Sequence, residues 1–220
     1  MNNNKENKFI ISSLITTLLL SILAFLLSVM IPRVNYNKVD DYIELSSTYG
    51  LVSNVVIKAE YNNIEVKGIG VRALSSKKIK EVSFEENSNV EYIERRAFYG
   101  SSIKSITIPN SVKNIYQNCF SYSLLEKVEF EDGSKVEAIS GSMFFECQNL
   151  SSVNIPNSVK SIGTFAFYNC KNLKSLYIPS GCKIYKDAFY GCDLVIYCSD
   201  TSNFQEGFDN NANIIIKSVA

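Results

Sequence analysis

The sequence predicts a solenoid that is mainly β, with parallel strands joined by short helical or irregular turns, and one N-terminal transmembrane helix. Three observations predict this fold class. The octapeptide IPNSVKNI at residues 108–115 returns as IPNSVKSI at 155–162, and an altered copy lies between them at 130–139. Apolar residues recur in the same columns across units of 21 to 25 residues. An uncharged run of 23 residues occupies positions 9–31.

The N-terminal segment is predicted to cross a membrane. Residues 1–8 are polar and would form a cytoplasmic N-terminus. At about 1.5 Å per residue, a helix over 9–31 would reach about 34 Å, enough to cross a hydrocarbon core of about 30 Å. The run is longer than the apolar region of a typical signal peptide, and its end, LSVMIP at 27–32, is a poor cleavage site. We therefore predict an uncleaved signal-anchor helix, with a cleaved signal peptide and a buried soluble helix as the alternatives.

The charges on either side of this run give a weak orientation signal. Lys5 and Lys8 precede it, whereas Arg33 and Lys38 follow it together with several acidic residues. The positive-inside bias slightly favours a cytoplasmic N-terminus. The chain would then be a single-pass membrane protein with its repeat domain outside, or a secreted protein if the segment is cleaved. Residues 32–54 are predicted to form a stalk and the N-terminal cap, without regular strand alternation.

The repeat region is predicted to span residues 55–198. Within each unit, apolar residues alternate with polar ones over four positions, which indicates a short strand with one buried face. We expect four residues of one such column to stack inside neighbouring strands: Ile106, Val128, Val153 and Leu176. A small residue followed by Phe, as in Ala97-Phe98 and Ala166-Phe167, is expected to fill the interior. Residues 199–220 would form the C-terminal cap, because an array must close its open core.

The pattern L-x-x-[IV]-x-I-P-x-x-V-x-x-I-G-x-x-A-F-x-x-C-x-x-L, as it stands at 150–173, resembles the BspA-like (TpLRR-type) class of leucine-rich repeat. Individual units depart from it, since Cys119 takes the Ala position and Ser123 the Cys position. The resemblance implies a right-handed solenoid with a parallel sheet along one side. It also implies a surface-exposed or secreted protein that binds other proteins or matrix, without catalytic residues.

The composition argues against several functions. Lys and Arg total 22 and Asp and Glu total 22, so no basic excess points to nucleic acid. Histidine is absent, which removes the commonest general base and zinc ligand. No paired-carboxylate or nucleophile–base constellation stands out. We therefore predict no enzyme, no cofactor, no metal site and no nucleic-acid partner.

Three of the six cysteines share one repeat column: Cys147, Cys170 and Cys192. Such a column could form a disulfide or metal ladder. The alternative, which is favoured, is that the thiols act as small buried hydrophobes, as free cysteines commonly do. The chain has no C-x-x-C pair, which argues against a zinc site, whereas a disulfide between neighbouring units stays open.

The outward strand positions form the predicted protein-binding face. They make a mixed and neutral stripe that suits an extracellular protein or glycan partner. The predicted residues are Ser105, Thr107, Lys127, Glu129, Ser152, Asn154, Ser175 and Tyr177. Tyr177 is the expected anchor, and the loops near Glu85 and Glu131 are competing sites. The predicted function is thus a membrane-anchored, surface-exposed module for protein binding or adhesion. A structural spacer, or a secreted repeat protein without a specific ligand, is the alternative.

Overall fold

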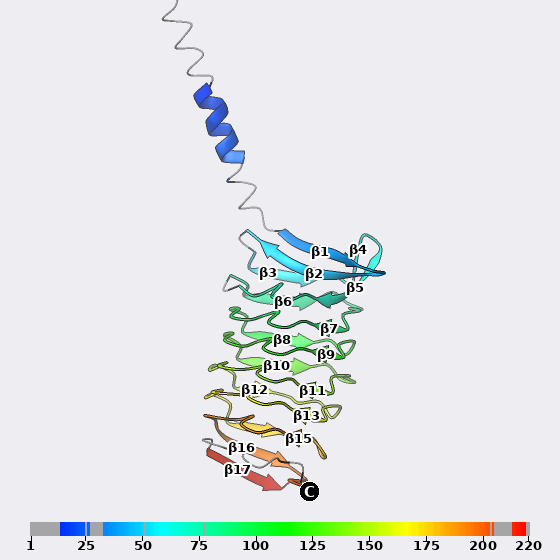
Figure 1. Cartoon of the computed structure of the whole chain (residues 1–220), viewed down its shortest axis with the longest axis vertical. Helices are drawn as coiled ribbons and strands as arrows, with labels where there is room; N and C mark the ends of the chain where they lie inside the picture. Colours follow the sequence, from blue (N-terminus) through cyan, green and yellow to red (C-terminus); the bar gives the residue numbers. More distant parts are fainter. Residues whose placement is uncertain are drawn as a thin grey trace, which may run out of the picture.

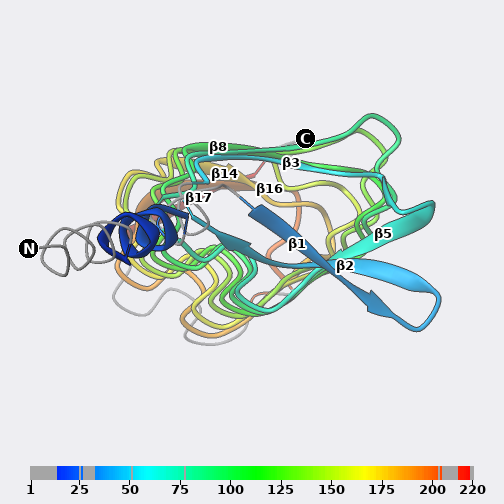
Figure 2. The same ribbon diagram turned by 90° about the horizontal axis from the view of Figure 1, so that it is seen from above.

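The computed structural model stacks successive turns of the chain into a solenoid (Figure 1). It describes residues 14–24, 26, 33–50, 52–76, 78–202, 204 and 213–218, and the structural statements below concern these residues. Seen along the long axis, the turns from neighbouring units superimpose (Figure 2). The molecule is therefore mainly a parallel β solenoid, as the recurring apolar columns predict.

One side of the solenoid is formed by what we call the first sheet. Its strands come from the alternating segment that opens each unit, and they run parallel in three hydrogen-bonded groups, β3–β6, β8–β10–β12 and β14–β16–β17. These strands are β3 (Asn54–Ile57), β6 (Glu81–Phe84), β8 (Ser105–Ile108), β10 (Lys127–Phe130), β12 (Ser152–Val153), β14 (Ser175–Tyr177), β16 (Asp193–Cys198) and β17 (Asn213–Ser218). The last of them, β17, lies within the predicted C-terminal cap and pairs with β16.

A second sheet runs along another side, in addition to the parallel sheet along one side that the resemblance implied. The apolar residues near the middle of each unit form short parallel strands there. They are β5 (Ile64–Ile69), β7 (Tyr92–Ile93), β9 (Asn114–Ile115), β11 (Ala138–Ile139), β13 (Ser161–Ile162) and β15 (Lys183–Ile184), with β4 (Glu60–Tyr61) antiparallel to β5. Each regular unit thus contributes one strand to the first sheet and another to the second.

The N-terminal end of the second sheet is extended by a hairpin. Strands β1 (Arg33–Val39) and β2 (Tyr42–Tyr49) pair antiparallel, and β2 runs parallel to β5. Their connection places Asp40 at a φ of 51°, a left-handed conformation that Asp tolerates better than most residues. Residues 34–39 and 42–45 therefore lie in paired strands, which the sequence did not predict. The sequence shows no clear alternation of apolar and polar residues here, because only Ile43 and Leu45 of the two strands are buried. The other residues of the hairpin are partly or fully exposed.

The predicted register of Ile106, Val128 and Val153 in the first sheet is confirmed. Val128 lies opposite Ile106 on one side and Val153 on the other, and all three are buried. Leu176 is also buried and lies opposite Ile196 in the next strand. Burying a Val, Leu or Ile side chain stabilises a fold by about 1.5–3 kcal/mol, so these columns supply much of the driving force for stacking.

A ladder of phenylalanines fills the interior beside the strands. Phe98, Phe120, Phe144, Phe167 and Phe189 are fully buried, and each ring stacks on the next at centroid distances of 5.0–5.6 Å. Phe120 keeps its place although Cys119 precedes it instead of Ala. Such aromatic pairs contribute about 0.5–1.5 kcal/mol each beyond the burial of their area.

The residue before the Ala-Phe pair, or before the equivalent pair of the other units, adopts a left-handed backbone conformation. The φ values lie between 55° and 60° for Arg72, Arg96, Asn118, Ser142, Phe165 and Asp187. None of these residues is glycine, although left-handed positions favour it. The regular stacking of the turns therefore imposes this conformation on whichever side chain occupies the column.

The predicted transmembrane segment, 9–31, lies partly outside the described residues, which cover 14–24 and 26 of it as helix. Among the residues that the structure does describe, no helix has the length and apolar character needed to span a membrane.

Candidate protein-binding surface

The eight predicted binding residues all lie exposed on the outward face of the first sheet. Because the strands are parallel and in register, the side chains form rows that run across the strands. Ser105, Lys127 and Ser152 share one row, and Thr107 and Glu129 share the next. The alternation of the sequence therefore predicted both the face and its composition.

Tyr177 is the most exposed aromatic residue of this face, at 64% of its surface. Its ring stacks on that of Tyr197 with a centroid distance of 4.7 Å and an interplanar angle of 16°. The two residues lie opposite each other on β14 and β16, and Lys217 of β17 follows in the same row, with its amino group 5.8 Å from the Tyr197 ring centre. Stacked rings with a cation nearby give this end of the face a rigid, amphipathic surface.

Tyr197 was missed by the sequence analysis because the unit around it is degenerate. The segment LVIYC at 194–198 alternates between buried and less buried residues as a strand should. Aligning this alternation with 175–177 would have placed Tyr197 beside Tyr177.

The charged part of the face is self-neutralised. Lys127 and Glu129 form an ion pair of 2.7 Å, and about half of each side chain is exposed. An exposed pair of this kind contributes little to stability, between about 0.2 and 1 kcal/mol. A partner that used either charge would have to compete with the other.

Asn154 has a structural contact that its position in the sequence did not predict. Its side-chain oxygen accepts a hydrogen bond from the Phe130 backbone N–H at 2.9 Å, and its amide nitrogen donates to the Phe130 carbonyl at 3.3 Å. The side chain thus continues the ladder beyond the short strand β12. Asn154 is exposed, but its polar atoms are already engaged.

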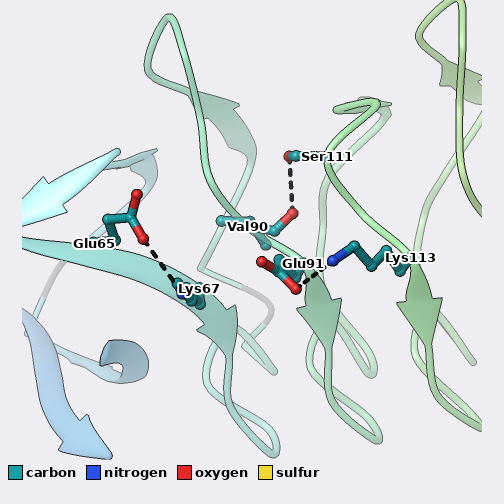
Figure 3. Close-up of polar contacts among 6 residues, drawn as sticks. All are labelled: Glu65, Lys67, Val90, Glu91, Ser111 and Lys113. Atoms are coloured by element: carbon teal, nitrogen blue, oxygen red, sulfur yellow. Dashed lines mark hydrogen bonds and ion pairs between the residues drawn. The ribbon is translucent and has the colours of Figure 1, made fainter. Parts of the chain in front are cut away.

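The edge of the second sheet carries pairs of opposite charges (Figure 3). Lys67 pairs with Glu65 at 3.3 Å, and Lys113 pairs with Glu91 at 2.7 Å. A third pair joins residues of the next two turns, Lys160 and Glu137, at 2.6 Å. The hydrogen bond from Lys113 is the main cause that lowers the pKa of Glu91 below its ordinary value. The Lys113–Glu91 and Lys160–Glu137 pairs therefore join neighbouring turns, whereas Lys67 and Glu65 lie on the same strand, β5.

The cysteine column is buried, as expected for thiols that act as small hydrophobes. All six cysteines are free thiols. In the shared column each Sγ donates to the carbonyl of a Phe one turn earlier, at distances of 2.9–3.1 Å: Cys147 to Phe120, Cys170 to Phe144 and Cys192 to Phe167. Within the described ranges, no group of three or more acidic, Cys or His residues is arranged to hold a metal ion.

Comparison with known proteins supports the repeat assignment. The model of the BspA type leucine rich repeat region matches residues 67–195 in six copies. The crystal structure of the T. pallidum Leucine Rich Repeat protein (TpLRR) is similar to the chain at 28% identity. It has a TM-score of 0.68 over 74% of this chain and 78% of that one. A leucine-rich repeat protein from Eubacterium ventriosum shares the fold, at 22% identity and a TM-score of 0.51 over 72% of this chain and 50% of that one. No curated protein matched the chain.

Proposed function

Because the chain belongs to the BspA-type leucine-rich repeat family, we propose that it is a surface module anchored in a membrane by residues 9–31 that binds a protein through the outward face of its first sheet. Leucine-rich repeat proteins generally bind proteins. The observation that carries the proposal is the stacking of the exposed Tyr177 ring on the partly buried Tyr197 ring, on a sheet whose neighbouring outward residues are small or polar.

The physical case rests on rigidity and composition. Tyr brings a large contact area at a low conformational cost, and it is enriched among the residues that dominate interface energies. Here the Tyr177 and Tyr197 rings already stack on each other, so binding would cost little further loss of side-chain freedom. Ser175 and Ser152, on the neighbouring row, are small enough to let a partner approach the rings closely.

Two observations shape the alternatives. The Lys127–Glu129 pair leaves the middle of the face without net charge, which keeps the structural-spacer function under consideration. The chain contains no histidine, and the proposal assigns it no catalysis. Adhesion would be one use of such a module if the partner belongs to another cell or to a matrix.

The test is a binding screen of the full chain in detergent against extracellular and matrix proteins, followed by substitution. Tyr177→Ala should weaken binding of any partner found by at least about tenfold, as expected for a central aromatic contact. Tyr185→Ala is the matched control, since Tyr185 lies just after the second-sheet strand β15. Equal affinities of the two variants would move the binding site away from the first sheet, and a screen without any partner would favour the spacer.

A further inference from the structure

A second, smaller site lies where the N-terminal hairpin joins the second sheet. A pocket of about 330 Å³ opens there, lined by Tyr42, Glu44, Glu91, Tyr92, Glu94, Asn114 and Tyr116. Its residues come from β2, β7 and β9 and from the positions that flank β7 and β9. None of these residues was predicted from the sequence to form a site.

Two glycines make room for the pocket's central contact. Glu44, Gly68 and Tyr92 lie in one row across β2, β5 and β7. The Tyr92 ring crosses over Gly68, where an added Cβ would lie 2.1 Å from the ring, and its hydroxyl donates to Glu44 at 3.1 Å. Gly70 likewise leaves space for the Glu44 carboxylate, which would lie 2.4 Å from a Cβ at that position. Because glycine has no side chain, Gly68 and Gly70 leave the space in which the Tyr92 hydroxyl meets the Glu44 carboxylate.

The pocket contains two tyrosine rings in contact and three carboxylates, of which only one is in an ion pair within the described ranges. Tyr42 meets Tyr92 edge to face, with centroids 6.0 Å apart and an interplanar angle of 82°. Glu91 is paired with Lys113, whereas neither Glu44 nor Glu94 forms an ion pair in the part of the chain that the structure describes. Partial burial is the main cause that raises the pKa of Glu44 above its ordinary value, and the charge of Glu94 adds to it. The pocket thus combines partly exposed aromatic surface with the carboxylates of Glu44 and Glu94, which form no ion pair with a cation among the described residues.

We propose that this pocket receives a basic side chain, arginine or lysine, of a protein partner. The Glu44 carboxylate would accept its hydrogen bonds, held in place by the Tyr92 hydroxyl, and the tyrosine rings would contact the cation and its aliphatic stem. Charge complementarity selects this occupant, because an anionic ligand would be repelled by Glu44 and Glu94. The carboxylates are also not arranged as a metal site within the described residues. The inference rests on the proposed function only in taking the partner to be a protein.

The test uses short peptides as probes, so it does not depend on finding the natural partner. A fluorescent peptide with two arginines is titrated against the full chain in detergent, and compared with the same peptide carrying the neutral analogue citrulline. The arginine peptide should bind saturably, and citrulline should weaken binding by at least about tenfold, because the charge pairing is lost. Glu44→Gln and Tyr92→Phe should each reduce the affinity of the arginine peptide, the first more strongly.

Two control variants separate the possible results. Glu137→Gln removes a carboxylate next to β11 of the same sheet but outside the pocket, and it should leave peptide affinity unchanged. Tyr177→Ala should also leave it unchanged, so that failure of the first-sheet interface and failure of this site give different results. Equal losses in Glu44→Gln and Glu137→Gln would indicate general attraction to an acidic face and would overturn the proposal. Equal binding of the arginine and citrulline peptides would overturn it as well.

Discussion

The hydroxyl of Ser111 donates a hydrogen bond of 2.8 Å to the backbone carbonyl of Val90, one turn earlier in the solenoid (Figure 3). In the second copy of the octapeptide, Ser158 makes the same contact with Val136 at 2.7 Å. Both serines are partly buried. The serine of the repeated octapeptide is therefore a link between turns, in addition to the apolar residues on either side of it.

Replacing this serine should destabilise each turn by a similar amount. We expect Ser111→Ala and Ser158→Ala each to lower the free energy of unfolding by about 0.5–1.5 kcal/mol, because a partly buried carbonyl loses its donor. Urea unfolding measures the change. Ser105→Ala is the control, since Ser105 is exposed on the first sheet, and it should change stability by less than about 0.5 kcal/mol. A loss in the control as large as in the two variants would rule out the inter-turn bond as the cause.

Two buried serines on adjacent turns should respond in opposite directions to the same substitution. Ser101 is fully buried and its hydroxyl has no hydrogen-bond partner among the residues that the structure describes. The hydroxyl of Ser121, also fully buried, donates to the Ser142 carbonyl at 2.7 Å. Removing an unpaired buried hydroxyl relieves a desolvation cost of about 1–3 kcal/mol, offset in part by a small cavity. We expect Ser101→Ala to raise the melting temperature and Ser121→Ala to lower it. Calorimetry of the two variants checks the signs, and a loss of stability in Ser101→Ala would show that its hydroxyl does find a partner.

The parts of the fold that follow from a repeated column could be predicted from the sequence. The register of Ile106, Val128 and Val153 and the exposure of Tyr177 depend only on alternation and repeat length, which are visible in the letters. The hairpin before the array and the position of Tyr197 could not be predicted in this way, because each occurs in a segment that does not repeat the pattern.

The pocket between the N-terminal hairpin and the second sheet could not be predicted from the sequence for a different reason. Its central row joins Glu44, Gly68 and Tyr92, which are separated by 24 residues at each step. Only Tyr92 lies in a unit with the regular pattern, and Gly68 has a role only once the strands are paired. A contact of this kind becomes visible when the register of the second sheet is known, and the sequence analysis had predicted no second sheet.

The membrane anchor is a separate prediction that rests on residues 9–31. If the run of uncharged residues stays in the mature protein with the repeat domain outside, protease added to intact cells should digest the array. N-terminal sequencing should then find a mature chain that still contains Phe9. A cytoplasmic protein of the same cells must remain intact as the control. A mature chain that begins near Ile31 would instead identify a secreted protein.

The buried thiols should make the fold sensitive to alkaline pH. Burial raises the pKa of Cys147 and of Cys192 to about 12 and that of Cys182 to about 11. A thiol in an unfolded chain titrates near pH 8.5. The unfolded chain therefore releases these protons first, so the stability that the neutral thiols contribute is complete below about pH 8.5 and is lost as the pH rises toward 12.

This dependence can be assigned to one residue by comparing wild type with Cys147→Ala. The variant should be less stable at pH 7.5, because it loses buried volume and the hydrogen bond from Sγ to the Phe120 carbonyl. Between pH 9 and 10.5, however, the free energy of unfolding of the wild type should fall more steeply, by up to about 1.4 kcal/mol per pH unit for one thiol. The difference between the two proteins should therefore narrow as the pH rises, since lysines and tyrosines titrate alike in both. Urea midpoints across this range measure it, and two parallel curves would show that the Cys147 thiol ionises as readily in the folded chain as in the unfolded one.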